Sequence, residues 1–155
     1  MLDRRQIHTV IDTLIKESRV RSVSDIHITE GMHVWYRIHG CLTQAREVLK
    51  EYDIREVLLG MMNEKQRKQF EDGQDVDFAW QTTDGCRQRV NIFCEQKKIA
   101  ATIRLLNQHI PTLEELKIPT TLYQLSEEPR GIILVTGPTG SGKSTTLAAV
   151  IEAMN

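Results

Sequence analysis

The sequence predicts an α/β protein in two parts. The first is an α+β domain with an antiparallel sheet and flanking helices, and the second begins with a strand, a phosphate-binding loop and a helix. Before residue 107, short segments alternate apolar and polar residues, as in strands with one exposed face. Residues 132–135 are continuously apolar, as in parallel-sheet strands covered on both faces. Between these regions, Pro111, Pro119 and Pro129 interrupt any long element.

Composition restricts the class of protein. The chain has 155 residues, 40% hydrophobic and 26% charged, which is typical of a globular protein rather than a disordered one. The formal net charge of -1 gives no basic field, so we expect no nucleic-acid partner. No apolar run approaches the roughly 20 residues that span a bilayer, and no secretory signal is recognisable. Cys41, Cys86 and Cys94 lack metal-ligand spacing, and we expect reduced thiols in a cytoplasmic protein.

The first part is expected to contain three helices and five strands. Apolar residues at helical spacing, beginning at Ile7, predict an amphipathic helix capped by Asp3. Asp53 and Asn63 are the predicted caps of two further helices within residues 53–71. Alternating segments predict strands at residues 25–29, 33–39, 75–80, 86–95 and 99–106. Asp84-Gly85 predicts a tight hairpin turn in which both central residues have positive φ.

The boundary between the two parts follows from the same patterns. Residues 1–110 form the predicted N-terminal domain, and residues 111–126 form a linker. A capping-box pattern at residues 112–115 predicts one short helix in this linker, and Leu122 and Leu125 suggest a second. Residues 127–155 begin the second domain.

The last two strands of the first part form a hairpin whose register is defined by its apolar residues. Keeping these residues on one face requires an even loop centred on Gln96-Lys97 and pairs Val90 with Ile103. The same register places Arg89 opposite Arg104 on the other face, where like charges are destabilising. Two interpretations remain open: a solvated polar face, or two guanidiniums that face a nucleotide phosphate.

A phosphate-binding loop follows the apolar segment of the second part. It fits G-x-x-x-x-G-K-[ST] at every fixed position, with the residues Gly137, Pro138, Thr139, Gly140, Ser141, Gly142, Lys143 and Ser144. Its glycines let the backbone curl so that successive N–H groups face an anion. Lys143 reaches the β- and γ-phosphates, the Ser144 hydroxyl ligates Mg²⁺, and Thr145 lies near the α-phosphate. We therefore predict binding of ATP and Mg²⁺. The alternative is a glycine-rich turn without a ligand.

Nucleotide binding alone does not give hydrolysis. Phosphoryl transfer also needs a second carboxylate for Mg²⁺ and a group that positions water. In P-loop proteins these groups lie on strands that follow the loop, and the sequence contains no such strands after residue 144. We therefore expect the sequence to be part of a longer protein and to be inactive as an ATPase by itself.

Four segments resemble the secretion and pilus motor ATPases, and specifically the PilT-like type IV pilus retraction (twitching motility) branch. They are Ser24-Asp25-Ile26-His27-Ile28, Arg37-Ile38-His39-Gly40, Arg87-Gln88-Arg89-Val90-Asn91, and Arg130-Gly131 leading into residues 137–146. The P-loop is common to many families, whereas the first and third segments are much more specific. His39 departs from the pattern, because an aspartate is common at that position.

The resemblance implies a PAS-like N-terminal domain, a linker and a RecA-like ATPase domain. It implies a homo-oligomer, namely a hexameric ring, at the cytoplasmic face of the inner membrane. The ring would be peripheral to the membrane and would contact a pilus platform protein there. It also implies that Arg89 and Arg104 act with Lys143 as catalytic residues, as arginine fingers on a phosphate of this subunit or of its neighbour.

Two other function classes were weighed against the motor ATPase. In the first, residues 1–110 serve as a non-catalytic oligomerisation or docking module. In the second, the chain is an unrelated P-loop enzyme such as a helicase, which the near-neutral charge and the N-terminal segments disfavour. Asp75 and Asp77 share one strand face, and we interpret them as solvated residues rather than as metal ligands.

Overall fold

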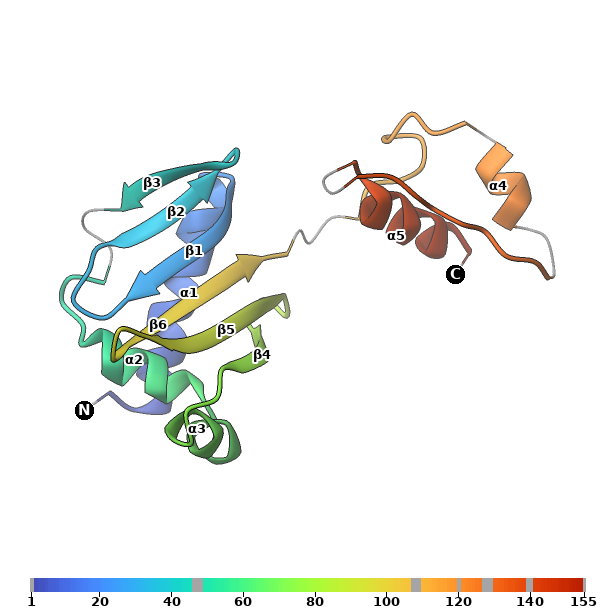
Figure 1. The fold of residues 1–155 in the computed structure, drawn as a ribbon. Helices are drawn as coiled ribbons and strands as arrows, with labels where there is room; N and C mark the ends of the chain where they lie inside the picture. Colours follow the sequence, from blue (N-terminus) through green and yellow to red (C-terminus); the bar gives the residue numbers. More distant parts are fainter. Residues whose placement is uncertain are drawn as a thin grey trace. The chain divides into compact units, whose positions relative to one another are not determined.

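The computed structural model describes residues 2–45, 49–106, 110–119, 121–126, 130–138 and 141–154. The chain divides into two compact units, Met1–Leu106 and Asn107–Asn155 (Figure 1). The division lies close to the predicted end of the first domain at residue 110. The assignment of residues 111–126 as a linker stays a prediction.

The first unit contains one antiparallel sheet in the order β3-β2-β1-β6-β5-β4 (Figure 1). Its strands are β1 (Val23–Thr29), β2 (Val34–Ile38), β3 (Cys41–Ala45), β4 (Val76–Gln81), β5 (Arg87–Glu95) and β6 (Lys98–Leu105). Each three-stranded half is a meander, and the pairing of β1 with β6 joins the two halves. The predicted α/β class, with an antiparallel sheet and flanking helices, is confirmed. Strand β3 was not predicted, because it is an edge strand with mostly exposed side chains and little apolar alternation.

Three helices accompany the sheet, and each begins at its predicted cap. Helix α1 (Arg4–Val20) begins with a capping box between Asp3 and Gln6, and α2 (Ile54–Met61) is capped by Asp53. Helix α3 (Glu64–Glu71) begins with a second capping box, made by Asn63 and Gln66. Side-chain oxygens that accept from the first helical N–H groups account for these starting points.

Helix α1 runs behind the sheet in Figure 1, and its apolar residues pack against the apolar face of the strands. The fully buried centre of this core contains Ile11, Ile15, Ile26, Ile28, Val57, Leu58, Val90, Ile92 and Ile103. No helix within the described residues of the first unit covers the opposite face of the sheet. The polar side chains of β1, β5 and β6 therefore lie together on one open face.

The two hairpin turns of the second meander differ. Gln96 and Lys97 both have positive φ, at 49° and 66°, and they form a two-residue turn that pairs Glu95 with Lys98. The turn at Asp84-Gly85 is instead part of a five-residue loop, residues 82–86, in which only Gly85 has positive φ. The predicted hairpin turn lies at Asp84-Gly85, but the positive φ expected at both residues is found only at Gly85. The Asp84 carboxylate accepts from the Thr82 hydroxyl and the Cys86 N–H and thereby stabilises the longer loop.

The second unit is built around a small apolar cluster of Leu113, Ala149 and Val150. It contains the short helix α4 (Thr121–Ser126) and helix α5 (Lys143–Met154). The capping-box bonds between Thr112 and Glu115 form, but residues 113–117 make turns rather than the expected helix. The expected strand at residues 132–135 is not formed, and the side chains of Ile132 and Leu134 are 87% and 81% exposed. A strand requires a hydrogen-bonded neighbour, and none of the described residues of this unit forms one. Apolar character alone therefore did not decide the conformation of this segment.

Candidate functional site

The P-loop ends where helix α5 begins. Gly137 and Gly142 have φ angles of 150° and 87°, which favour glycine and allow the chain to bend sharply before the helix. A Cβ atom on Gly137 would lie 2.8 Å from the Ser141 hydroxyl, so the loop approaches itself closely there. The Thr146 N–H bonds the Gly142 carbonyl at 2.9 Å, which makes Gly142 the residue before the first helical turn. Thr139 and Gly140 lie outside the described residues.

The described loop residues provide donors suited to a phosphate. Lys143 and Ser144 open α5, whose first N–H groups have no helical partners and carry the positive end of the helix dipole. The Lys143 ammonium donates to the Pro138 carbonyl and so lies folded back over the loop. Ser144 and Thr145 follow with hydroxyl groups, the first of which could ligate Mg²⁺. The geometry of these residues fits a nucleotide phosphate, while their roles stay predictions.

The predicted register of the arginine hairpin is confirmed. Strand β5 pairs with β6 so that Arg89 lies opposite Arg104 and Val90 lies opposite Ile103. Both apolar residues are completely buried against the helices, which prevents a shift of one residue. The two arginines consequently lie on the open face, with side chains that are 65% and 62% exposed.

Two aspartates, whose part in this site the sequence analysis missed, relieve the repulsion between the arginines. Asp77 of β4 accepts from Arg89 Nε at 3.0 Å and from Arg89 Nη2 at 2.7 Å, which is a bidentate pair. Asp25 of β1 accepts from Arg104 Nε at 2.9 Å. Within the described residues, no group of three or more histidine, cysteine or acidic side chains has the geometry of a metal site. Asp77 thus serves as an ion-pair partner.

The four strands at the centre of the open face carry a row of charges. Strand pairing places Arg37, Asp25, Arg104 and Arg89 side by side on β2, β1, β6 and β5. Asp25 lies between two arginines, because Arg37 Nε also approaches it, at 3.6 Å. The first resemblance segment therefore meets the second in space, through Asp25 and Arg37.

Electrostatics in this row favour the charged carboxylates. Burial would raise the pKa of Asp25, but hydrogen bonds from Arg104 and Ser24 and the charge of Arg104 outweigh it, so its pKa is lowered. The hydrogen bonds from Arg89 lower the pKa of Asp77, and the same pair raises the pKa of Arg89. Burial and the charge of Arg37 lower the pKa of His27. These shifts favour the charged forms of Asp25, Asp77 and Arg89 and the neutral form of His27.

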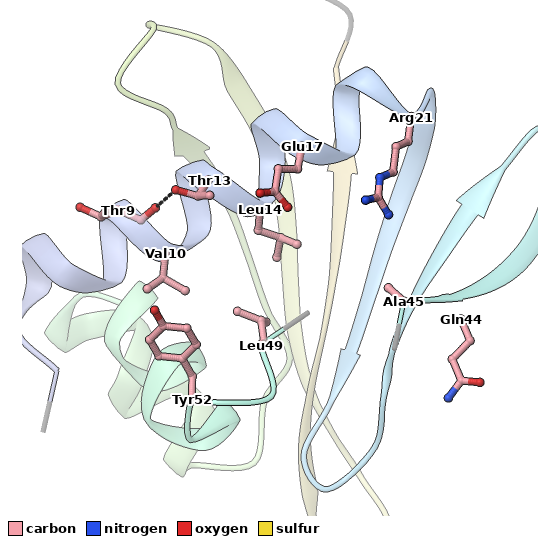
Figure 2. A pocket seen from close by; sticks show the side chains of 10 residues that line it. All are labelled: Thr9, Val10, Thr13, Leu14, Glu17, Arg21, Gln44, Ala45, Leu49 and Tyr52. Carbon is pink, nitrogen blue, oxygen red and sulfur yellow. Dashed lines mark hydrogen bonds between the residues drawn. The ribbon is translucent and has the colours of Figure 1, made fainter. Parts of the chain in front are cut away.

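A separate hollow of about 630 Å³ lies on the helical side of the first unit (Figure 2). It is lined by Thr9, Val10, Thr13, Leu14, Glu17, Arg21, Gln44, Ala45, Leu49 and Tyr52. The threonine hydroxyls donate to backbone carbonyls one turn earlier, so they are already engaged. None of the lining residues belongs to the P-loop or to the arginine row, and the hollow is therefore not the candidate site.

Comparison with known proteins assigns the chain to a family. The family model described as "Type II/IV secretion system protein" matches residues 1–155. The chain belongs to this family. A type IV pilus retraction ATPase, PilT of Pseudomonas aeruginosa, is 36% identical over 146 residues, covering 94% of this chain and 42% of PilT. The twitching motility protein of Neisseria gonorrhoeae is 42% identical over 146 residues, covering 92% of this chain and 38% of that protein.

A solved structure shows the same relationship. The crystal structure of the pilus retraction motor PilT with bound ADP superposes with a TM-score of 0.78 at 36% identity, covering 92% of this chain and 42% of PilT. The chain thus spans about 40% of the length of these relatives. Within the described residues, no helix has both the length and the apolar character needed to cross a membrane.

Proposed function

We propose that this chain is the nucleotide-binding part of a motor ATPase that powers type IV pilus retraction. The whole protein would hydrolyse ATP as a hexameric ring, peripheral to the cytoplasmic face of the inner membrane and in contact with a platform protein. The observation that carries the proposal is a complete P-loop signature at the start of α5, in a chain that matches the motor family along its whole length. The ADP bound to the related PilT supports a nucleotide at this loop.

Each residue of the proposed site has a defined task. The backbone N–H groups of the loop, which Pro138 lacks, would face the phosphates, and Lys143 would contribute a mobile charge. Ser144 would hold Mg²⁺, which neutralises phosphate charge when it is bound. Arg89 and Arg104 would supply positive charge to a phosphoryl group of this subunit or of a neighbour. Planar guanidiniums with several donors suit such a group better than ammonium ions do.

The decisive experiment replaces Lys143 in the whole protein. We expect Lys143→Ala to lower the ATPase rate at least about a hundredfold, since one well-placed cationic donor contributes on this order to transition-state stabilisation. Lys117→Ala is the matched control, because Lys117 lies in a turn of the same unit and outside the loop. An unchanged rate in Lys143→Ala, with folding preserved, would refute the assignment.

The rival proposal is a docking module whose P-loop has no role in this chain. It is favoured by the open polar face of the first unit, where exposed arginines are available to a partner. Calorimetric titration of Mg-ATP into the 155-residue chain separates the two proposals. Saturable binding that Lys143→Ala abolishes supports the nucleotide site. Absence of binding supports the docking module for this chain.

A further inference from the structure

The two exposed arginines of the row are held in different ways. Arg89 uses Nε and Nη2 on the same Asp77 carboxylate, so half of its fork is occupied. Arg104 uses only Nε, which donates to Asp25 at 2.9 Å. Among the described residues, neither terminal nitrogen of Arg104 has a hydrogen-bond partner, and the side chain is 62% exposed. Arg104 is therefore fixed at the base of its guanidinium and open at the tip.

The carboxylate that holds Arg104 is itself immobile. Asp25 is only 8% exposed and lies on β1, between β2 and β6 in the middle of the sheet. The Ser24 hydroxyl donates to it at 2.9 Å, and Arg37 flanks it on the other side. Asp77, by comparison, is 45% exposed on the edge strand β4. A buried and multiply bonded carboxylate orients its partner far better than one that water can reach.

We propose that Asp25 is a positioning residue that presets Arg104 for an anionic oxygen. The Nε–Asp25 bond fixes the plane of the guanidinium, and both terminal nitrogens remain available as a two-donor fork. Phosphoryl oxygens match this fork. The inference rests on the proposed function, in which that anion is a nucleotide phosphate. Asp25 does not touch the nucleotide and acts through Arg104.

Presetting has a measurable consequence. An arginine that is disordered before the reaction must be immobilised in the transition state. This ordering lowers the rate constant by on the order of threefold to tenfold. Asp25→Ala should therefore lower kcat about fivefold while KM for ATP changes little, since Arg104 acts mainly on the developing charge. Asp25→Asn retains one acceptor oxygen and should have an intermediate effect.

A double-mutant cycle in the whole protein tests the proposal. Asp25→Ala should have no further effect on kcat when Arg104 is already alanine, because the two residues act as one unit. Asp84→Ala is the matched control, since Asp84 also pairs with an arginine of this unit, Arg19 at 3.0 Å, away from the row. It should leave kcat unchanged. Equal losses from Asp25→Ala in both backgrounds would overturn the proposal and indicate a purely structural role.

A measurement without nucleotide gives a second test. In the ¹⁵N-labelled 155-residue chain, the Arg104 Nε–H signal should be protected from solvent exchange in the wild type and in Asp77→Asn. It should lose this protection in Asp25→Ala. Protection that persists in Asp25→Ala would overturn the proposal. If Asp25→Ala does not fold, Ser24→Ala is used instead, because it removes one hydrogen bond to the Asp25 carboxylate. It should reduce kcat and the protection of the Arg104 Nε–H by a smaller amount. No change in either quantity would refute the proposal.

Failure of this inference is distinguishable from failure of the proposed function. If Lys143→Ala and Arg104→Ala abolish or impair turnover but Asp25→Ala does not, only the positioning role is wrong. If Lys143→Ala retains full turnover, the proposed ATPase is wrong, and the Nε–H exchange still reports whether Asp25 orders Arg104.

Discussion

Helix α1 is tied to the β4–β5 loop through one buried carboxylate, and its removal gives a stability prediction. Asp12 is 4% exposed and accepts from Trp80 Nε1 at 3.3 Å and from the Thr83 N–H at 2.8 Å. Hydrogen bonds to a charged group contribute about 1.5–3 kcal/mol each, and the longer bond belongs at the low end of this range. We therefore expect Asp12→Ala to lower the free energy of unfolding by about 3 kcal/mol.

Urea unfolding of the 155-residue chain, followed by tryptophan fluorescence, measures this loss. Asp12→Asn retains an oxygen for one donor and should cost only about 1 kcal/mol. Thr13→Ala is the control on the same helix, because the Thr13 hydroxyl only bonds the Thr9 carbonyl in an exposed position. A loss below about 1 kcal/mol in Asp12→Ala would refute the reasoning, since both donors would then have found other acceptors.

Three further predictions concern stability. A Cβ on Gly60 would lie 2.0 Å from Ile7 Cδ1. Gly60→Ala should therefore lower the free energy of unfolding by about 1–2 kcal/mol, even after the gain in helix propensity. Adding Ile7→Val should recover most of this loss in thermal melts. Asn63→Ala removes the cap of α3 and should cost about 1 kcal/mol, whereas Asn63→Asp should be neutral by the same melts. The pKa of Asp77 is lowered, and the pKa of Asp84 is lowered to about 2, so both carboxylates stabilise the fold above the unfolded-state pKa. Stability should fall as the pH drops from about 4 to 2, and Asp84→Asn should reduce this slope in urea titrations.

Local patterns in the sequence were sufficient for most elements. The starts of α1, α2 and α3 were predictable because a cap depends on residues within one turn. The β5–β6 register was predictable because side chains alternate with a period of two. Strand β3 escaped prediction because an edge strand buries little apolar surface. Residues 132–135 were wrongly expected to form a strand, since strand formation also needs a neighbour.

The sequence by itself determined the P-loop signature, its place at the start of α5 and the juxtaposition of Arg89 with Arg104. These features depend on contiguous residues or on one hairpin. Only the tertiary structure decided which carboxylates hold the two arginines. Asp25 reaches Arg104 because β1 pairs with β6, although the two strands lie at opposite ends of the first unit's sequence. Asp77 reaches Arg89 because β4 pairs with β5. Strand order is a long-range outcome of packing the whole apolar face, and no local pattern encodes it.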